Sequence, residues 1–188
     1  MGKERPAPGD LEHVRSFVNT RDIEERTDEL MTPRDLHEWM VSRGLLAPDE
    51  AAGEADLRRA LKLREGLRMM LLANNGAPVN SAAADILDAA ARHARLGARF
   101  RQDGSAALEP GAHGVDAGIG RLLAIVYAAM ADGSWLRLKA CRNPDCHWIF
   151  YDATKNRSGA WCEMGLCGNR AKARSYRERH RPDMVPEA

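Results

Sequence analysis

Residues 141–181 read CRNPDCHWIFYDATKNRSGAWCEMGLCGNRAKARSYRERHR, and this stretch decides how the C-terminal part of the chain folds. It holds all four cysteines of the protein, as two pairs with C-x4-C spacing that are separated by a 15-residue arm. Each pair can close around one face of a tetrahedral ion, and the arm is long enough to bring the second pair to the same metal. The spacing therefore predicts one structural Zn²⁺ bound by four thiolates, those of Cys141, Cys146, Cys162 and Cys167.

Other uses of these cysteines fit the sequence less well. Disulfides require an oxidising compartment, whereas the chain begins MGKERPAPGD with no apolar signal segment, so we expect a cytoplasmic protein. A dithiol redox site favours Cys-x-x-Cys, and neither pair has that spacing. An iron–sulfur cluster also takes four thiolates, and spacing alone leaves it open. His147 directly follows Cys146, but beside four thiolates we expect it to pack or to make an outer hydrogen bond rather than to bind the metal.

The segment after the last cysteine favours a helix and carries a basic residue on most turns, until Pro182 stops it. The start of this helix would direct backbone N–H groups toward the thiolates. Arginines at positions 170, 174, 177 and 181 fall along one helical stripe, which suits contacts to a phosphate backbone. The candidate nucleic-acid contacts are Asn169, which reads a base or caps the helix, and the basic residues Arg170, Lys172, Arg174, Arg177, Arg179 and Arg181.

The paired cysteines, Trp161 and the string Cys167-Gly168-Asn169-Arg170 with its basic tail resemble the CGNR zinc-finger family. Members of that family occur mostly in bacterial proteins described as stress-induced transcriptional regulators, which usually carry an N-terminal ABATE domain. The string FVNT at 17–20 and the run at 57–72 resemble parts of that domain. The resemblance implies an ABATE-like mainly helical domain at 1–134, a CGNR-type zinc finger at 135–182 and a short tail at 183–188.

Two positions depart from this family pattern. Many relatives have an acidic residue before the FVNT string, where this chain has Ser16. Many also have an arginine just before the tryptophan, where this chain has Gly159 and Ala160. The second departure weakens the expectation that the arm between the cysteine pairs contacts nucleic acid.

Composition allows one domain with a small appended module. The chain has 188 residues, of which 44% are hydrophobic, and no apolar run approaches the ~20 residues of a membrane span. Its net charge of +1 hides an asymmetry, because residues 137–181 contain 11 Lys or Arg against 4 Asp or Glu. Polyanion binding would therefore be confined to the C-terminal module. A basic helix that only offsets the thiolates and contacts the acidic body explains the charge equally well.

Hydrophobic periodicity predicts a mostly α fold with a small β-hairpin, an α+β body. A hairpin is indicated at 98–109 around Asp103-Gly104, and a strand at 135–140 would feed the first cysteine pair and meet a second strand at 147–151. The four-cysteine zinc module is then treble-clef-like or ribbon-like and ends in the basic helix. Helices are expected near 11–18, 32–44, 54–73, 81–96 and 116–132.

Two groups of polar residues in the body need an interpretation. The cluster Asn19-Thr20-Arg21-Asp22 is interpreted as capping and turn residues. Helix 54–73 is basic on one side, which we interpret as a solvated face; its basic residues are Arg58, Arg59, Lys62, Arg64 and Arg68.

No phosphate-binding loop, dinucleotide fingerprint or nucleophile elbow is present, so we do not expect an enzyme. The first hypothesis is a DNA-binding transcriptional regulator with structural zinc, stress-responsive if it follows the family. The second is RNA binding, with Trp148, Tyr151 or Trp161 stacking on bases. The third is an adaptor whose basic helix meets an acidic partner protein. An effector, small molecule or protein, would act on the N-terminal domain; no membrane partner is expected, and a homo-oligomer would help specific DNA recognition.

Overall fold

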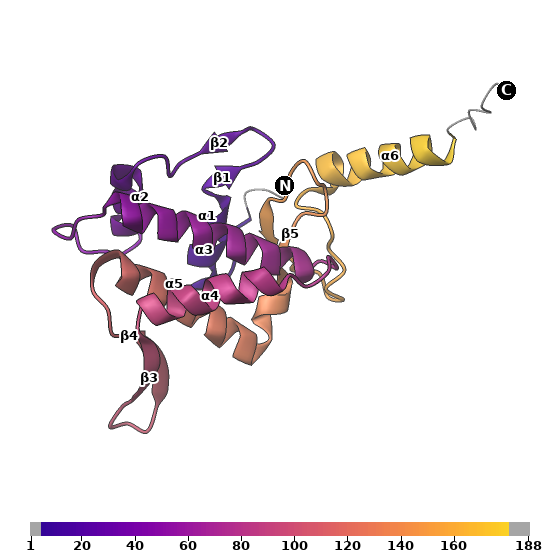
Figure 1. Cartoon of the computed structure of the whole chain (residues 1–188). Coiled ribbons are helices and arrows are strands. Elements are labelled where there is room, and N and C mark those ends of the chain that lie inside the picture. Colours follow the sequence, from indigo (N-terminus) through magenta and orange to yellow (C-terminus); the bar gives the residue numbers. More distant parts are fainter. Residues whose placement is uncertain (1–4, 181–188) are drawn as a thin grey trace.

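The computed structural model describes residues 5–180, which form a helical body with a four-cysteine module at one end (Figure 1). The prediction of a mostly helical fold with small β-hairpins and a C-terminal four-cysteine module is confirmed. The helices are α1 (Leu11–Asn19), α2 (Pro33–Val41), α3 (Glu54–Ala73), α4 (Ser81–His93), α5 (Gly114–Asp132) and α6 (Asn169–Arg179).

The core of the body lies where α1, α3 and α5 meet. Side chains of these three helices are fully or almost fully buried, including Phe17, Leu67 and Ile119. Each such burial contributes about 1.5–3 kcal/mol relative to an exposed position, so the apolar stripes hold the helices together. Gly66 lets α4 approach α3 closely, because a Cβ atom there would lie 2.7 Å from the Ile86 side chain.

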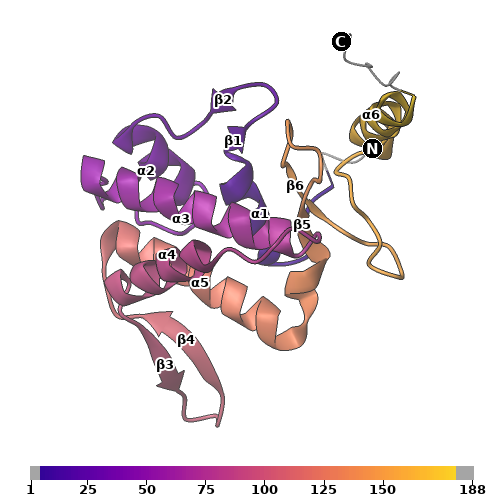
Figure 2. The same ribbon diagram turned by 45° about the vertical axis from the view of Figure 1, so that its right-hand side comes forward.

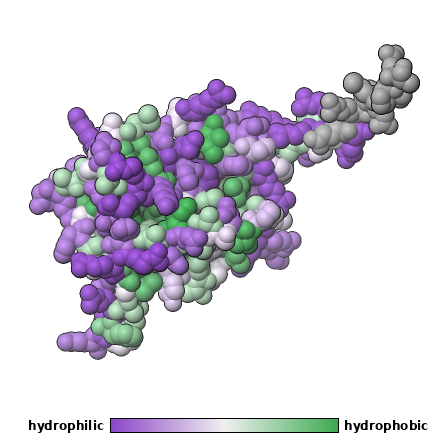
Figure 3. Space-filling view, in the orientation of Figure 1, coloured by the Kyte–Doolittle hydropathy of each residue, from purple (hydrophilic) through white to green (hydrophobic). Residues whose placement is uncertain are grey.

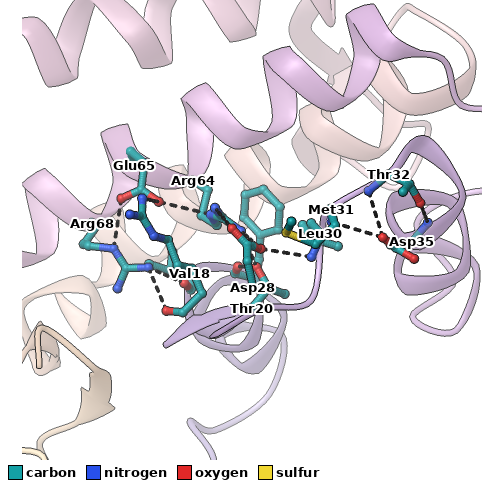
Figure 4. Close-up of polar contacts among 12 residues, drawn as sticks. Val18, Thr20, Asp28, Leu30, Met31, Thr32, Asp35, Arg64, Glu65 and Arg68 are labelled. Atoms are coloured by element: carbon teal, nitrogen blue, oxygen red, sulfur yellow. Dashed lines mark hydrogen bonds and ion pairs between the residues drawn. The ribbon is translucent and has the colours of Figure 1, made fainter. Parts of the chain in front are cut away.

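Helix α2 begins where the sequence predicts. Thr32 accepts a hydrogen bond from the Asp35 backbone N–H, and the Asp35 carboxylate accepts one from the Thr32 N–H at 2.8 Å. Pro33 occupies the first helical position, where its missing N–H costs nothing. Figure 4 draws this capping box in the same view as Arg64 and Arg68 of α3.

Within residues 5–180, three antiparallel two-stranded sheets complete the fold. The β3–β4 hairpin projects from the body in both ribbon views (Figure 2). It is the predicted hairpin, but it begins earlier, since α4 already ends at His93 and Arg95 turns the chain with a left-handed φ of 48°. The strands are β1 (Arg21–Asp22) with β2 (Thr27–Asp28), β3 (Leu96–Phe100) with β4 (Ala106–Pro110), and β5 (Leu138–Ala140) with β6 (Ile149–Tyr151).

The prediction of a strand over 135–140 is wrong in its first half. Gly133 ends α5 with a φ of 78°, and a 3-10 turn follows over Ser134–Arg137. The turn places the Trp135 side chain in the same core as Leu138. In a strand, these two side chains would point to opposite faces. Only Leu138–Ala140 is extended, and it pairs with β6 as expected.

Among the described residues, α5 alone is long and apolar enough by composition to cross a membrane, although no apolar run stood out in the sequence. Half of its most apolar stretch is buried inside the fold, with Ile119 and Leu122 in the core. Helix α5 therefore lies where a core helix of a folded domain lies. Such a core helix and a membrane span have similar composition.

The interpretation of the basic side of α3 as a solvated face is wrong for two of its residues. Arg64 is 2% exposed and donates to both carboxylate oxygens of Asp28 at 2.7 Å (Figure 4). Arg68 is 4% exposed and donates to the carbonyl oxygens of Val18 and Arg21. The β1–β2 hairpin covers this face, so long-range packing decides the burial of both guanidinium groups.

Candidate metal centre and the helix that follows it

The four cysteine sulfur atoms lie within 4.8 Å of one another, and every one of these residues is at most 4% exposed. Two of the separations are 3.6 Å, from Cys146 to Cys162, and 3.7 Å, from Cys162 to Cys167. A tetrahedral zinc ion with Zn–S bonds of ~2.3 Å requires sulfur atoms ~3.8 Å apart. The cluster therefore has the size and chemistry of one structural zinc site.

The first cysteine pair lies in the turn between β5 and β6. The Cys141 N–H donates to the carbonyl of Trp148, and the Cys146 N–H donates to the carbonyl of Asn143, both at 2.9 Å. His147 then turns the chain with a left-handed φ of 50°. These bonds fold 141–147 into a knuckle that presents both sulfur atoms on one side.

The second pair lies at the start of the C-terminal helix. Cys162 precedes a π-helical turn over Met164–Gly168, which contains Cys167 and runs directly into α6. Gly168 is needed there, since a Cβ atom would lie against the Met164 sulfur and 3.3 Å from the Trp161 ring. The sequence left two topologies open, treble-clef-like and ribbon-like. A knuckle, a hairpin and a helix that begins at the last ligand make the module treble-clef-like.

The thiols perturb one another strongly. Hydrogen bonds from Cys146 and Cys162 lower the pKa of the Cys141 thiol, while the contact with Cys141 raises the pKa of Cys146 and that of Cys162. Four thiols this close cannot all ionise without a cation between them. A bound dication would replace the shared protons and hold all four as thiolates.

Asn143 is a functional residue that sequence reasoning missed. It is 3% exposed; its Nδ2 lies 3.7 Å from the Cys167 sulfur, and its Oδ1 accepts a hydrogen bond from Arg174. Such outer-shell contacts orient metal ligands. The only signal in the sequence for this contact is the position of Asn143 between the first two cysteines. His147 lies outside the four-thiol group. Burial is the main reason that its pKa is lowered, and the charge of the neighbouring Arg68 lowers this pKa further.

Asparagine side chains of the body hold the backbone of the module. The Asn19 amide donates to and accepts from the backbone of Ile149 in β6. Asn75 donates to the carbonyls of Ala140 and Ala160. The interpretation of Asn19 as a local capping residue is therefore wrong, because its partner lies on another part of the chain, whereas Thr20 does bond locally, to the Phe17 carbonyl.

Arg68 joins the body to the first cysteine knuckle. Its guanidinium donates to the carbonyl of His147 at 3.1 Å, in addition to its bonds within the body. Burial lowers the pKa of Arg68, and the nearby Glu65 carboxylate, at 3.1 Å, opposes that shift. The paired charge is thus fixed between α3 and the residue that follows Cys146.

A buried ion pair stabilises the arm between the cysteine pairs. Lys139 donates to the Asp152 carboxylate at 2.8 Å, and both side chains are at most 6% exposed. Burial alone would raise the pKa of Asp152, but hydrogen bonds from Lys139, Thr154 and Gly159 lower it to about 2. Every oxygen of this carboxylate therefore has protein donors.

Helix α6 carries the candidate nucleic-acid contacts. Some of these side chains have partners within the protein, and others have none within 5–180. Asn169 donates back to the carbonyl of Gly165, Arg170 pairs with Glu24 of the β1–β2 turn, and Arg174 pairs with Asp145 at 3.3 Å. Arg181 lies outside the described residues. Three basic side chains are exposed and have no protein partner within 5–180: Lys172, Arg177 and Arg179.

A helical domain followed by a buried four-thiolate module defines a zinc-finger protein. The chain belongs to the ABATE family, whose model, described as "Putative stress-induced transcription regulator", matches residues 13–133. The model of the CGNR zinc finger matches residues 137–180. Comparison with curated proteins found no match.

Proposed function

We propose that this protein is a DNA-binding transcriptional regulator in which a structural zinc ion fixes the beginning of α6. The observation that carries the proposal is the placement of α6, which projects away from the body (Figures 1 and 2). Lys172, Arg177 and Arg179 stand exposed on it without partners in the described part of the chain. The projecting part of the molecule that α6 forms is mostly hydrophilic in the space-filling view (Figure 3). A helix of this kind suits the phosphate backbone of a duplex.

Zinc has a structural role in this proposal. Four protein thiolates fill a tetrahedral coordination sphere and leave no open position for a substrate or a reactive water. The cluster is also buried, so its chemistry is confined to folding. The proposal therefore assigns no catalysis to the metal centre, and the protein acts by binding.

We further propose the domain division 1–134, 135–182 and 183–188, with the first domain as the base on which the finger is mounted. The bonds from Asn19, Asn75 and Arg68 support this arrangement, because they hold the finger backbone from three points. In such an arrangement an effector on the body would change how α6 is presented. Cytoplasmic location and pairing of two copies on DNA belong to the same proposal.

The test is binding of the zinc-replete full chain to random duplex DNA and to single-stranded RNA across a salt series. The protein is compared with the double variant Lys172→Glu/Arg177→Glu. A matched control reverses two exposed arginines on the body, Arg58→Glu/Arg92→Glu, and makes the same change in net charge. Zinc content is measured for each protein.

Duplex binding should weaken steeply with salt, with a slope of about −0.9 per phosphate contact. The helix variant should lose binding by at least about tenfold at low salt while keeping its zinc, and the control should bind nearly as the wild type does. Preference for single-stranded RNA would replace DNA by RNA as the target. No binding to either would overturn the proposal in favour of a protein partner.

A further inference from the structure

A pocket of about 300 Å³ lies in the zinc finger beside β6. Phe150 and Tyr151 line it from the strand, and Trp161 lines it from the residue before the third cysteine. Arg5 and Thr154 lie at the same pocket. Three aromatic side chains around one small cavity are a notable concentration, since aromatic residues make up only 5% of the chain.

Packing of the module explains only part of this aromatic cluster. Phe150 is 6% exposed and packs with the buried cysteines, so it belongs to the core of the finger. Tyr151 and Trp161 are only half-buried. Neither the Tyr151 hydroxyl nor the Trp161 indole N–H has a hydrogen-bond partner within the described range. Both rings thus offer an apolar surface and an unused polar group to a ligand.

The charge of the pocket favours an anionic ligand. Asp152 is the one acid in its lining, and Lys139, Thr154 and Gly159 already occupy that carboxylate. Arg5 is exposed and has no partner among residues 5–180. The pocket therefore presents an aromatic surface and one free positive group, beside the occupied carboxylate of Asp152 and Cys162 of the metal centre.

The pocket is adjacent to the beginning of α6. A Cβ atom at Gly168 would lie 3.3 Å from the Trp161 ring, so this ring packs against the residue that directly precedes the helix. A polyanion that follows the exposed basic side chains of α6 would come close to the Trp161 side of the pocket.

We propose that this pocket binds one unpaired nucleobase of the nucleic acid, with Arg5 facing the neighbouring phosphate. The inference rests on the proposed function and names the form of nucleic acid that the finger prefers. The volume is at the lower end for small-molecule sites, which suits a single nucleotide. Aromatic side chains hold unstacked bases by stacking and tolerate any base, because every base has a π-face.

The test uses the zinc-replete full chain and three DNA duplexes that differ at one position. The first is fully paired, the second carries one unpaired 2-aminopurine, and the third carries an abasic residue in place of that base. Binding is measured by anisotropy at low salt, and 2-aminopurine fluorescence reports whether the base changes its environment. The variants are Trp161→Leu and Tyr151→Leu, with Tyr127→Leu as the matched control, since Tyr127 is an exposed aromatic residue of α5 that does not line this pocket.

The duplex with the unpaired base should bind about fivefold or more tightly than the abasic duplex, and its fluorescence should change on binding. Trp161→Leu and Tyr151→Leu should remove this preference without changing affinity for the fully paired duplex, and Tyr127→Leu should keep it. If Trp161→Leu loses zinc, Tyr151→Leu decides. Equal affinity for the base-containing and abasic duplexes, with duplex binding intact, would overturn the inference alone. Absence of binding to all three would overturn the proposed function as well.

Discussion

The side-chain amide of Asn19 pairs with both backbone groups of Ile149, which lies 130 residues further along the chain. Its Oδ1 accepts from the Ile149 N–H at 2.8 Å, and its Nδ2 donates to the Ile149 carbonyl at 2.9 Å. Both residues are buried, so no water substitutes for these bonds. Asn19 thus supplies to β6 the pairing that a further strand would give, and it fixes the zinc finger to α1.

Asn19→Ala should lower the free energy of unfolding by about 1–3 kcal/mol, because it leaves the buried N–H and carbonyl of Ile149 without partners. Chemical denaturation of the zinc-loaded protein measures the change. Asn156→Ala is the control, since Asn156 is exposed in the arm of the finger. Equal stability of the two variants would show that the Asn19 pairing adds nothing to the attachment of the finger.

Cys141→Ser and Cys167→Ser should each release the zinc and unfold the finger, while the helical body stays folded. Three thiolates and a hydroxyl bind zinc much less tightly, and the finger has a small core of its own built on the cysteines. The body keeps the core formed by α1, α3 and α5. Metal analysis and far-ultraviolet circular dichroism measure both effects. One full equivalent of zinc retained in both variants would contradict the assignment of the ligands.

Gly159→Ala should destabilise the finger by about 1–3 kcal/mol through overpacking. A Cβ atom at this position would lie 2.8 Å from the Asp152 carboxyl group, which cannot move because Lys139 and Thr154 hold it. Thermal unfolding and zinc retention against a competing chelator measure the loss. Gly165→Ala is the control, because nothing lies within 4 Å of a Cβ atom there. A variant as stable as the control would mean that the ion pair shifts easily.

Local patterns of sequence predicted much of this fold. The spacing of four cysteines indicated the metal centre because ligand geometry depends on a short stretch of chain. The start of α2 depends on Thr32, Pro33 and Asp35, whose hydrogen bonds are local and include one from the Met31 N–H to Asp35. These features need no knowledge of distant partners, and the same holds for the apolar stripes of the long helices.

Features that depend on distant partners were missed. The burial of Arg64 requires Asp28, which lies 36 residues earlier, and nothing near Arg64 in the sequence indicates it. Arg68 likewise finds its carbonyl partners in three other segments. The 3-10 turn at Trp135 accompanies the packing of this ring in the core, against residues that are distant in the sequence. Periodicity reports which residues alternate, but it does not show which side chains a later segment will cover.

Asp28→Asn should lower the stability of the body by about 2 kcal/mol at neutral pH, because Arg64 loses a charged partner. Burial alone would raise the pKa of Asp28, but the hydrogen bond from Arg64 and its charge lower it below 3.8. A lowered folded-state pKa stabilises the protein above pH 3.8, and this contribution is lost as the pH falls through the folded-state value.

The difference between wild type and Asp28→Asn should therefore be constant at neutral pH and should shrink below pH 3.8. Denaturation is measured across pH with the zinc removed by a chelator, so that metal release does not contribute. Asp49→Asn is the control, since Asp49 is exposed and its side chain has no partner among the described residues. A difference that stays unchanged down to the lowest pH would show that the Asp28 carboxylate does not carry the stabilisation.

Glu24→Gln should tighten binding to duplex DNA by about two- to fivefold, if α6 contacts DNA as proposed. Glu24 pairs with Arg170 at the beginning of α6, so the carboxylate competes with phosphate for that guanidinium. Anisotropy at one low salt concentration measures the change. Glu25→Gln is a matched control, since it removes the same charge from the next residue of the same turn, and Glu25 is exposed. Equal gains in both variants would assign the effect to net charge alone, whereas a gain confined to Glu24→Gln would show that the β1–β2 turn masks the first arginine of the helix.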